Sequence, residues 1–107
     1  MFLNEELLKI AKKADVTRTE EIQKLNADLC EKCEEYYKSR LGDDMSDTKK
    51  IKAVLDRTFN LWDSFVRMAE KDSDIKINIL AGLFKKHSFR HQFLSNKKIS
   101  IIYNKLI

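Results

Sequence analysis

The only cysteines and the only histidines of this chain form two pairs whose spacing suits metal binding. Two residues separate Cys30 from Cys33, and three separate His87 from His91. Thiolate and imidazole are usual ligands of zinc, which takes four in a tetrahedral site, and one helical turn brings such pairs together. Cys30, Cys33, His87 and His91 are therefore candidate zinc ligands. The fifty-three residues between the pairs far exceed the spacing of a zinc finger, so the alternative is packed cysteines and surface histidines without a cofactor.

The C-terminal third of the chain is basic. All seventeen acidic residues lie at or before Asp74, whereas residues 75–107 carry seven Lys or Arg and no acid, within a net charge of +4 for the whole chain. Such an asymmetry points to an anionic partner, and nucleic acid is the leading candidate. Lysines would neutralise phosphates, while Ser and Asn would reach base edges. The predicted nucleic-acid contacts are Lys85, Lys86, Arg90, Lys97, Lys98, Ser100, Asn104 and Lys105.

Two further interpretations of this basic segment are possible from its sequence. A short helix over 88–94, a break at 95–97 and a helix to 106 would have the proportions of a helix-turn-helix unit. Aromatic residues lie between the bases and could stack on single strands, but Phe89 and Phe93 are four residues apart and more often belong to a core. The alternative for the whole segment is a solvated basic face above buried apolar residues.

A second kind of contact is suggested by Tyr36 and Tyr37, which are adjacent and cannot both point inward from one helix. One tyrosine is therefore expected at the surface, where it could anchor a protein partner. This pair supports a second hypothesis, a non-enzymatic interaction module, adaptor or inhibitor, which docks on an acidic or nucleic-acid-binding surface of another protein.

The sequence contains no catalytic constellation. It has no glycine-rich phosphate loop, no H-E-x-x-H motif and no nucleophile elbow, and its carboxylates fit solvated helix faces. We therefore expect no enzymatic activity. The first hypothesis is a small nucleic-acid-binding or nucleic-acid-associated regulatory protein, and a homodimer is left open.

The composition of the chain indicates its cellular location. No apolar run approaches the roughly eighteen residues of a membrane span, and the first fourteen residues alternate charged and apolar types unlike a signal peptide. Two cysteines do not make a disulfide framework in a chain of this size. These features predict a cytoplasmic protein without a membrane partner.

The elements that must position these residues are predicted to be helices only. The chain has no proline and only two glycines, which leaves too few turn residues for a β-rich domain. We predict one all-α domain over 1–107, a compact bundle of roughly four to six helices, with helices near 18–41 and 48–71 packed antiparallel as its frame. Residues 1–74 would be an acidic or mixed scaffold, and 75–107 a basic helical segment.

Helix ends are predicted from cap residues, and buried faces from the spacing of apolar residues. The third helix has the widest apolar face, with Trp62 as a packed aromatic. Ile75 and Ile79 are expected on the buried face of the fourth helix, together with Leu80, Leu83 and Phe84. The expected cap residues are Asn4, Thr17 paired with Glu20, Gly42, Ser46 or Asp47, a cap within 72–74, and Ser88.

Overall fold

The chain folds into helices alone over the residues that the structure, a computed structural model, describes, which are 2–42 and 47–95. The helices are α1 (Leu3–Lys13), α2 (Thr19–Leu41), α3 (Thr48–Glu70), α4 (Ile75–Lys86) and α5 (Phe89–Leu94). The prediction of an all-α bundle is confirmed. None of these helices is long and apolar enough to cross a membrane.

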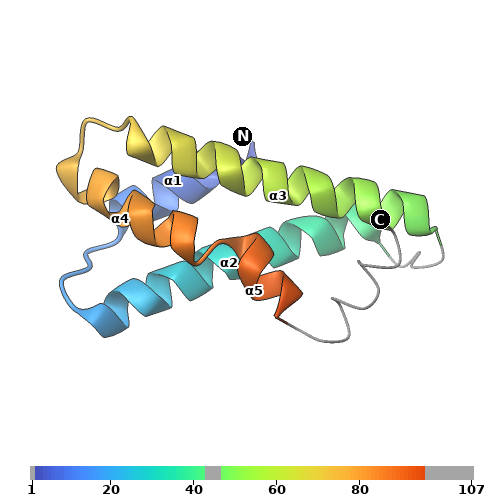
Figure 1. Cartoon of the computed structure of the whole chain (residues 1–107), viewed down its shortest axis with the longest axis horizontal. Helices are drawn as coiled ribbons and strands as arrows, with labels where there is room; N and C mark the ends of the chain where they lie inside the picture. The colour runs from blue at the N-terminus through green and yellow to red at the C-terminus, as the bar shows by residue number, and fades with distance from the viewer. Residues whose placement is uncertain (1, 43–46, 96–107) are drawn as a thin grey trace.

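Two helices of 23 residues each, α2 and α3, extend along the long axis of the molecule. Figure 1 shows α3 beside α2, with α4 and α5 in front of this pair. Helix α1 has only 11 residues and packs against both α2 and α3, whereas α4 packs mainly on α3. The short α5 contacts both long helices.

Several helix ends carry the predicted caps. The side chain of Asp47 accepts a hydrogen bond from the backbone N–H of Lys50 at the start of α3, and that of Ser88 accepts from His91 at the start of α5. Gly42 follows α2 with a φ of 62°, a backbone conformation that glycine adopts without steric cost. These short-range signals therefore place helix ends correctly where the chain bonds to itself locally.

Two predicted caps are wrong. Helix α1 begins at Leu3, and Asn4 lies inside it with its amide Nδ2 donating to Ser64 Oγ of α3 at 2.9 Å. Helix α2 begins at Thr19 after Arg18, without a side-chain cap, and Thr17 bonds instead to the side chain of Glu21 at 3.4 Å. The local pattern assigned the Asn4 side chain to a helix end, but this side chain hydrogen-bonds to Ser64 in another helix instead.

The centre of the core lies along α3. Trp62 is buried, with an exposed fraction of 1%, and its indole Nε1 donates to the carbonyl oxygen of Phe84 in α4 at 3.1 Å. Its ring lies 5.3 Å from that of Phe65, centroid to centroid. The prediction of Trp62 as a packed aromatic is confirmed, and its hydrogen bond ties α4 to α3.

The buried face of α4 differs from the predicted one. Ile75 and Ile79 are exposed, whereas Ile77 and Ala81 are fully buried. Helix α4 carries apolar residues around most of its circumference, so their spacing alone does not decide which side meets the core. The packing on α3 selects Ile77, Leu80, Ala81 and Phe84.

Candidate interaction surfaces

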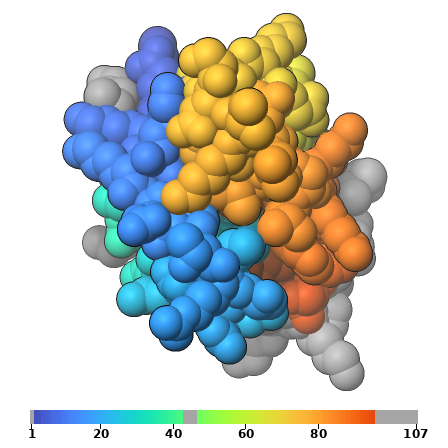
Figure 2. Space-filling view, turned by 90° about the vertical axis from the view of Figure 1, so that its left-hand side faces the viewer, coloured from blue at the N-terminus to red at the C-terminus, as the bar shows by residue number. Residues whose placement is uncertain are grey.

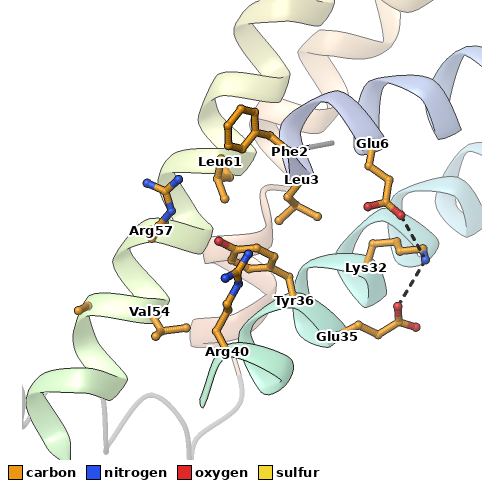
Figure 3. A pocket seen from close by; sticks show the side chains of 11 residues that line it. Phe2, Leu3, Glu6, Lys32, Glu35, Tyr36, Arg40, Val54, Arg57 and Leu61 are labelled. Atoms are coloured by element: carbon orange, nitrogen blue, oxygen red, sulfur yellow. Dashed lines mark ion pairs between the residues drawn. The ribbon is translucent and has the colours of Figure 1, made fainter. Parts of the chain in front are cut away.

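A groove opens where α1 begins, because α1 covers only part of the length of the long helices. The groove has a volume of about 610 Å³. Residues 2, 3 and 6 close one end, α2 forms one wall from Lys32 to Arg40, and α3 forms the other from Ala53 to Leu61 (Figure 3). We call this surface the three-helix groove.

Apolar side chains line the inside of the three-helix groove. Leu3 is buried, while Tyr36, Val54 and Leu61 are half-buried. Phe2 has an exposed fraction of 65%, and Figure 3 shows its ring over Leu61 at the end of the groove. Apolar surface left open between helices is a common feature of sites that accept a further helix.

The carboxylates at the α1 end of the groove are already paired. Lys32 Nζ lies 3.5 Å from Glu6 Oε1 and 3.5 Å from Glu35 Oε2. The charges of Glu35 and Glu6 raise the pKa of Lys32 above its ordinary value. Two carboxylates share one ammonium group here, so this part of the rim keeps a net negative charge.

The opposite part of the rim carries cations that have no acidic partner in the described part of the chain. Arg40 and Arg57 are exposed, and neither forms an ion pair with any residue that the structure describes. The guanidinium carbon of Arg40 lies 5.1 Å from the centre of the Tyr36 ring, a cation–π distance. This end of the groove is therefore apolar inside and positively charged at its edges.

The two adjacent tyrosines divide as predicted between surface and core. Tyr37 is buried, and its ring makes an edge contact with Phe93 at 5.6 Å between centroids. Burial raises the pKa of its phenol. Tyr36 is half-buried and lines the three-helix groove. Of the two predicted protein contacts, only Tyr36 is placed to meet a partner.

The described part of the basic cluster is mixed rather than uniformly positive. Lys85 and Lys86 are exposed at the end of α4. Arg90 lies 3.8 Å from Asp63 and 5.0 Å from the centre of the Phe59 ring, so it helps to hold α5 on α3. Lys85 and Arg90 share a groove of about 440 Å³ that Asp63 and Glu70 also line. Acids of α3 therefore offset part of this positive charge.

The remaining predicted nucleic-acid contacts, Lys97, Lys98, Ser100, Asn104 and Lys105, lie outside the described residues, as does the second helix of the predicted helix-turn-helix. Phe89 and Phe93 are buried, so they belong to the core and offer no stacking surface for bases. Their centroids lie 5.8 and 5.6 Å from that of Phe59.

The cysteines behave as small apolar residues. Cys30 and Cys33 are both buried. Burial raises the pKa of Cys30 to about 12, and burial together with the neighbouring Cys30 also raises that of Cys33. Because the thiolate is the form that binds metal or attacks electrophiles, these environments disfavour both roles.

The predicted zinc ligands do not form a site. His87 and His91 are exposed and line a separate groove of about 680 Å³ between α2 and the α4–α5 corner. Among the described residues, which include all four predicted ligands, no three His, Cys, Asp or Glu side chains are placed to hold a metal ion. The cysteine pair belongs to the core and the histidine pair to the surface. Helical spacing places the two members of each pair on one side of a helix, but the fold does not join the two pairs into one site.

Most residues of the three-helix groove carry no functional signal in the sequence. Of its lining residues only Tyr36 was predicted as a contact. Phe2 gave a weak indication of a contact surface. It is a large aromatic residue that precedes the first turn of α1, so it does not belong to the buried apolar stripe of that helix. Asn26 was also missed, although its Nδ2 donates to the carbonyl oxygen of His87 and joins α2 to the end of α4 at 3.2 Å.

No protein family, no curated protein and no solved structure matches this chain.

Proposed function

We propose that this protein is a non-enzymatic interaction module that binds an acidic amphipathic helix of a partner protein in the three-helix groove. One observation carries the proposal: an apolar groove lies open between α2 and α3 where α1 begins, and Arg40 and Arg57 border it without acidic partners among the described residues. An occupant that adds a helix along this groove would bury apolar surface against Tyr36, Val54 and Leu61.

The charge of the rim supports an acidic occupant. A helix with apolar residues at i, i+3 or i+4 and i+7 would place them on the floor of the groove, with its flanking positions beside the two arginines. Carboxylates at those positions would complement the guanidinium groups, and basic residues would be repelled by them.

Charge reversal at the groove tests this function. A displayed library of amphipathic helical peptides, with random charges beside a constant apolar stripe, would be selected on the natural protein. We expect acidic peptides to be enriched. Arg40→Glu combined with Arg57→Glu should weaken them about tenfold, since two rim attractions of roughly 0.2–1 kcal/mol each become repulsions.

The control is Arg67→Glu, compared with the single variant Arg57→Glu: both reverse one charge on α3, but Arg67 lies outside the groove, beside Trp62 and Glu70. We expect it to leave the affinity unchanged within about twofold. Selection of basic peptides, or equal loss with Arg67→Glu, would contradict the proposal.

Nucleic-acid binding is the second candidate function. It is supported by the exposure of Lys85 and Lys86, which form no ion pair with described residues, and by the absence of acids from residue 75 onward.

A titration with duplex DNA and with RNA at two salt concentrations tests this second function. Neutralisation of six phosphates by the predicted Lys and Arg contacts would give a slope of log K against log salt of about −5 on duplex DNA. Lys85→Ala with Lys86→Ala should make the slope shallower by about two, whereas Lys49→Ala with Lys50→Ala, two exposed lysines at the start of α3, should not. Absence of binding even at low salt would exclude this function.

A further inference from the structure

Helix α4 is apolar on two opposite sides, and only one of them meets the core. Seven of its twelve residues are apolar. Four of these are buried against the bundle, whereas Ile75 and Ile79 on the far side have exposed fractions of 75% and 69%. Figure 2 shows α4, in gold and orange, at the surface with no other described element over it. Helices that are apolar all round are normally covered on both sides.

The exposed side of α4 is a continuous stripe. Ile75, Ile79, Gly82 and Lys86 follow one another in steps of four, three and four, so they share a face of the helix. Nothing lies within 4 Å of the position that a Cβ on Gly82 would occupy. The stripe therefore offers a protruding isoleucine and, one turn away, an open space.

The charges at the two ends of α4 are opposite. Asp74 caps its start, where its side chain accepts from the backbone N–H of Lys76 at 2.9 Å. Lys85 and Lys86 lie at its end, and both are exposed. A copy of the same helix packed antiparallel would place each acidic end beside a basic end, whereas parallel packing would place like charges together.

We propose that the exposed side of α4 binds a second copy of this chain, with the two α4 helices antiparallel across a twofold axis. In this arrangement Ile79 enters the space beside Gly82 of the second copy, and Ile75 lies along the aliphatic part of its Lys86. The charged head of that lysine then reaches Asp74. One patch thus supplies both halves of the contact, as a twofold interface requires.

The size of the patch sets the strength of this dimer. Two twelve-residue helices bury less than the roughly 1,200 Å² of a standard interface, so we expect weak association, with a dissociation constant of about 0.1 mM. The interface uses no residue of the three-helix groove, so it does not depend on the function proposed above.

Sedimentation equilibrium from about 5 µM to about 1 mM tests the dimer. The natural protein should show a monomer–dimer equilibrium. Ile79→Lys and, separately, Gly82→Gln should each raise the dissociation constant at least about tenfold, because one places a charge in the contact and the other fills the open space. Both positions are exposed, so the monomers should fold, and circular dichroism would verify this.

Two controls make the result specific. Asn60→Lys adds the same charge at an exposed position of α3 and should leave the dimer unchanged. Lys86→Glu should weaken it, while Lys86→Arg should preserve it. A natural protein that remains monomeric at the highest concentration, or a dimer insensitive to Ile79→Lys, would overturn the proposal.

Discussion

Replacing Trp62 with alanine is expected to lower the free energy of unfolding by about 3–5 kcal/mol. The side chain is almost fully buried, and it packs on Phe65 and Phe84 with centroid distances of 5.3 and 6.4 Å. Its removal leaves a large cavity between α3 and α4 and an unpaired carbonyl at Phe84. Since domains of this size have total stabilities of about 5–15 kcal/mol, the loss is a large share of the whole.

Urea unfolding followed by circular dichroism measures this effect. The variant lacks the only tryptophan of the chain, so indole fluorescence cannot serve both proteins. Trp62→Phe separates volume from hydrogen bonding: it keeps an aromatic ring but removes the donor to Phe84, and a smaller loss of about 1–3 kcal/mol is expected. Equal stability of the alanine variant and the natural protein would contradict the packing described for the α3–α4 contact.

Replacing Phe59 with alanine should cost a similar amount, about 3–5 kcal/mol, but for a different contact. Phe59 is buried on α3, and its ring contacts the rings of Phe89 and Phe93 of α5. The guanidinium group of Arg90 lies over the same ring. Helix α5 has only six residues, and such a short helix depends on tertiary packing for its stability. The substitution should therefore detach α5 before the rest of the bundle unfolds.

Amide hydrogen exchange distinguishes this local effect from global loss. Protection should fall most in α5, and the double variant with Phe93→Ala should cost less than the sum of the two single changes because the rings are in contact. Arg90→Ala is the control: its ion pair with Asp63 is half-exposed, so a change within about 1 kcal/mol is expected. Strict additivity of the two phenylalanine changes would show that they do not share one cluster.

Local patterns predicted the helices well because helices are stabilised by contacts between residues close in sequence. The expected helices near 18–41 and 48–71 correspond to Thr19–Leu41 and Thr48–Glu70. Asp47 and Ser88 cap their helices through the N–H three residues later, a bond that needs no other part of the chain. Asn4 was assigned wrongly because its partner, Ser64, lies sixty residues away.

The faces of the helices were predictable only where the apolar stripe is single. Helix α3 has one wide apolar face, and Trp62 and Phe65 are buried there as the spacing indicates. Helix α4 has two apolar faces. The spacing favoured burial of Ile75 and Ile79, whereas Ile77 and Ala81 are the residues buried against the bundle. Both choices satisfy helical periodicity, so only the fit against α3 separates them.

The sequence by itself determined that this protein is helical, where most helices begin and end, and that one of two tyrosines must face outward. The tertiary structure decided which tyrosine, which side of α4 is exposed, and that the cysteine and histidine pairs stay apart. It also created the three-helix groove, since that surface exists only because α1 is shorter than the two helices it packs on. Relations of this kind join residues far apart in the chain, whereas periodicity and capping report only on neighbours within a few turns.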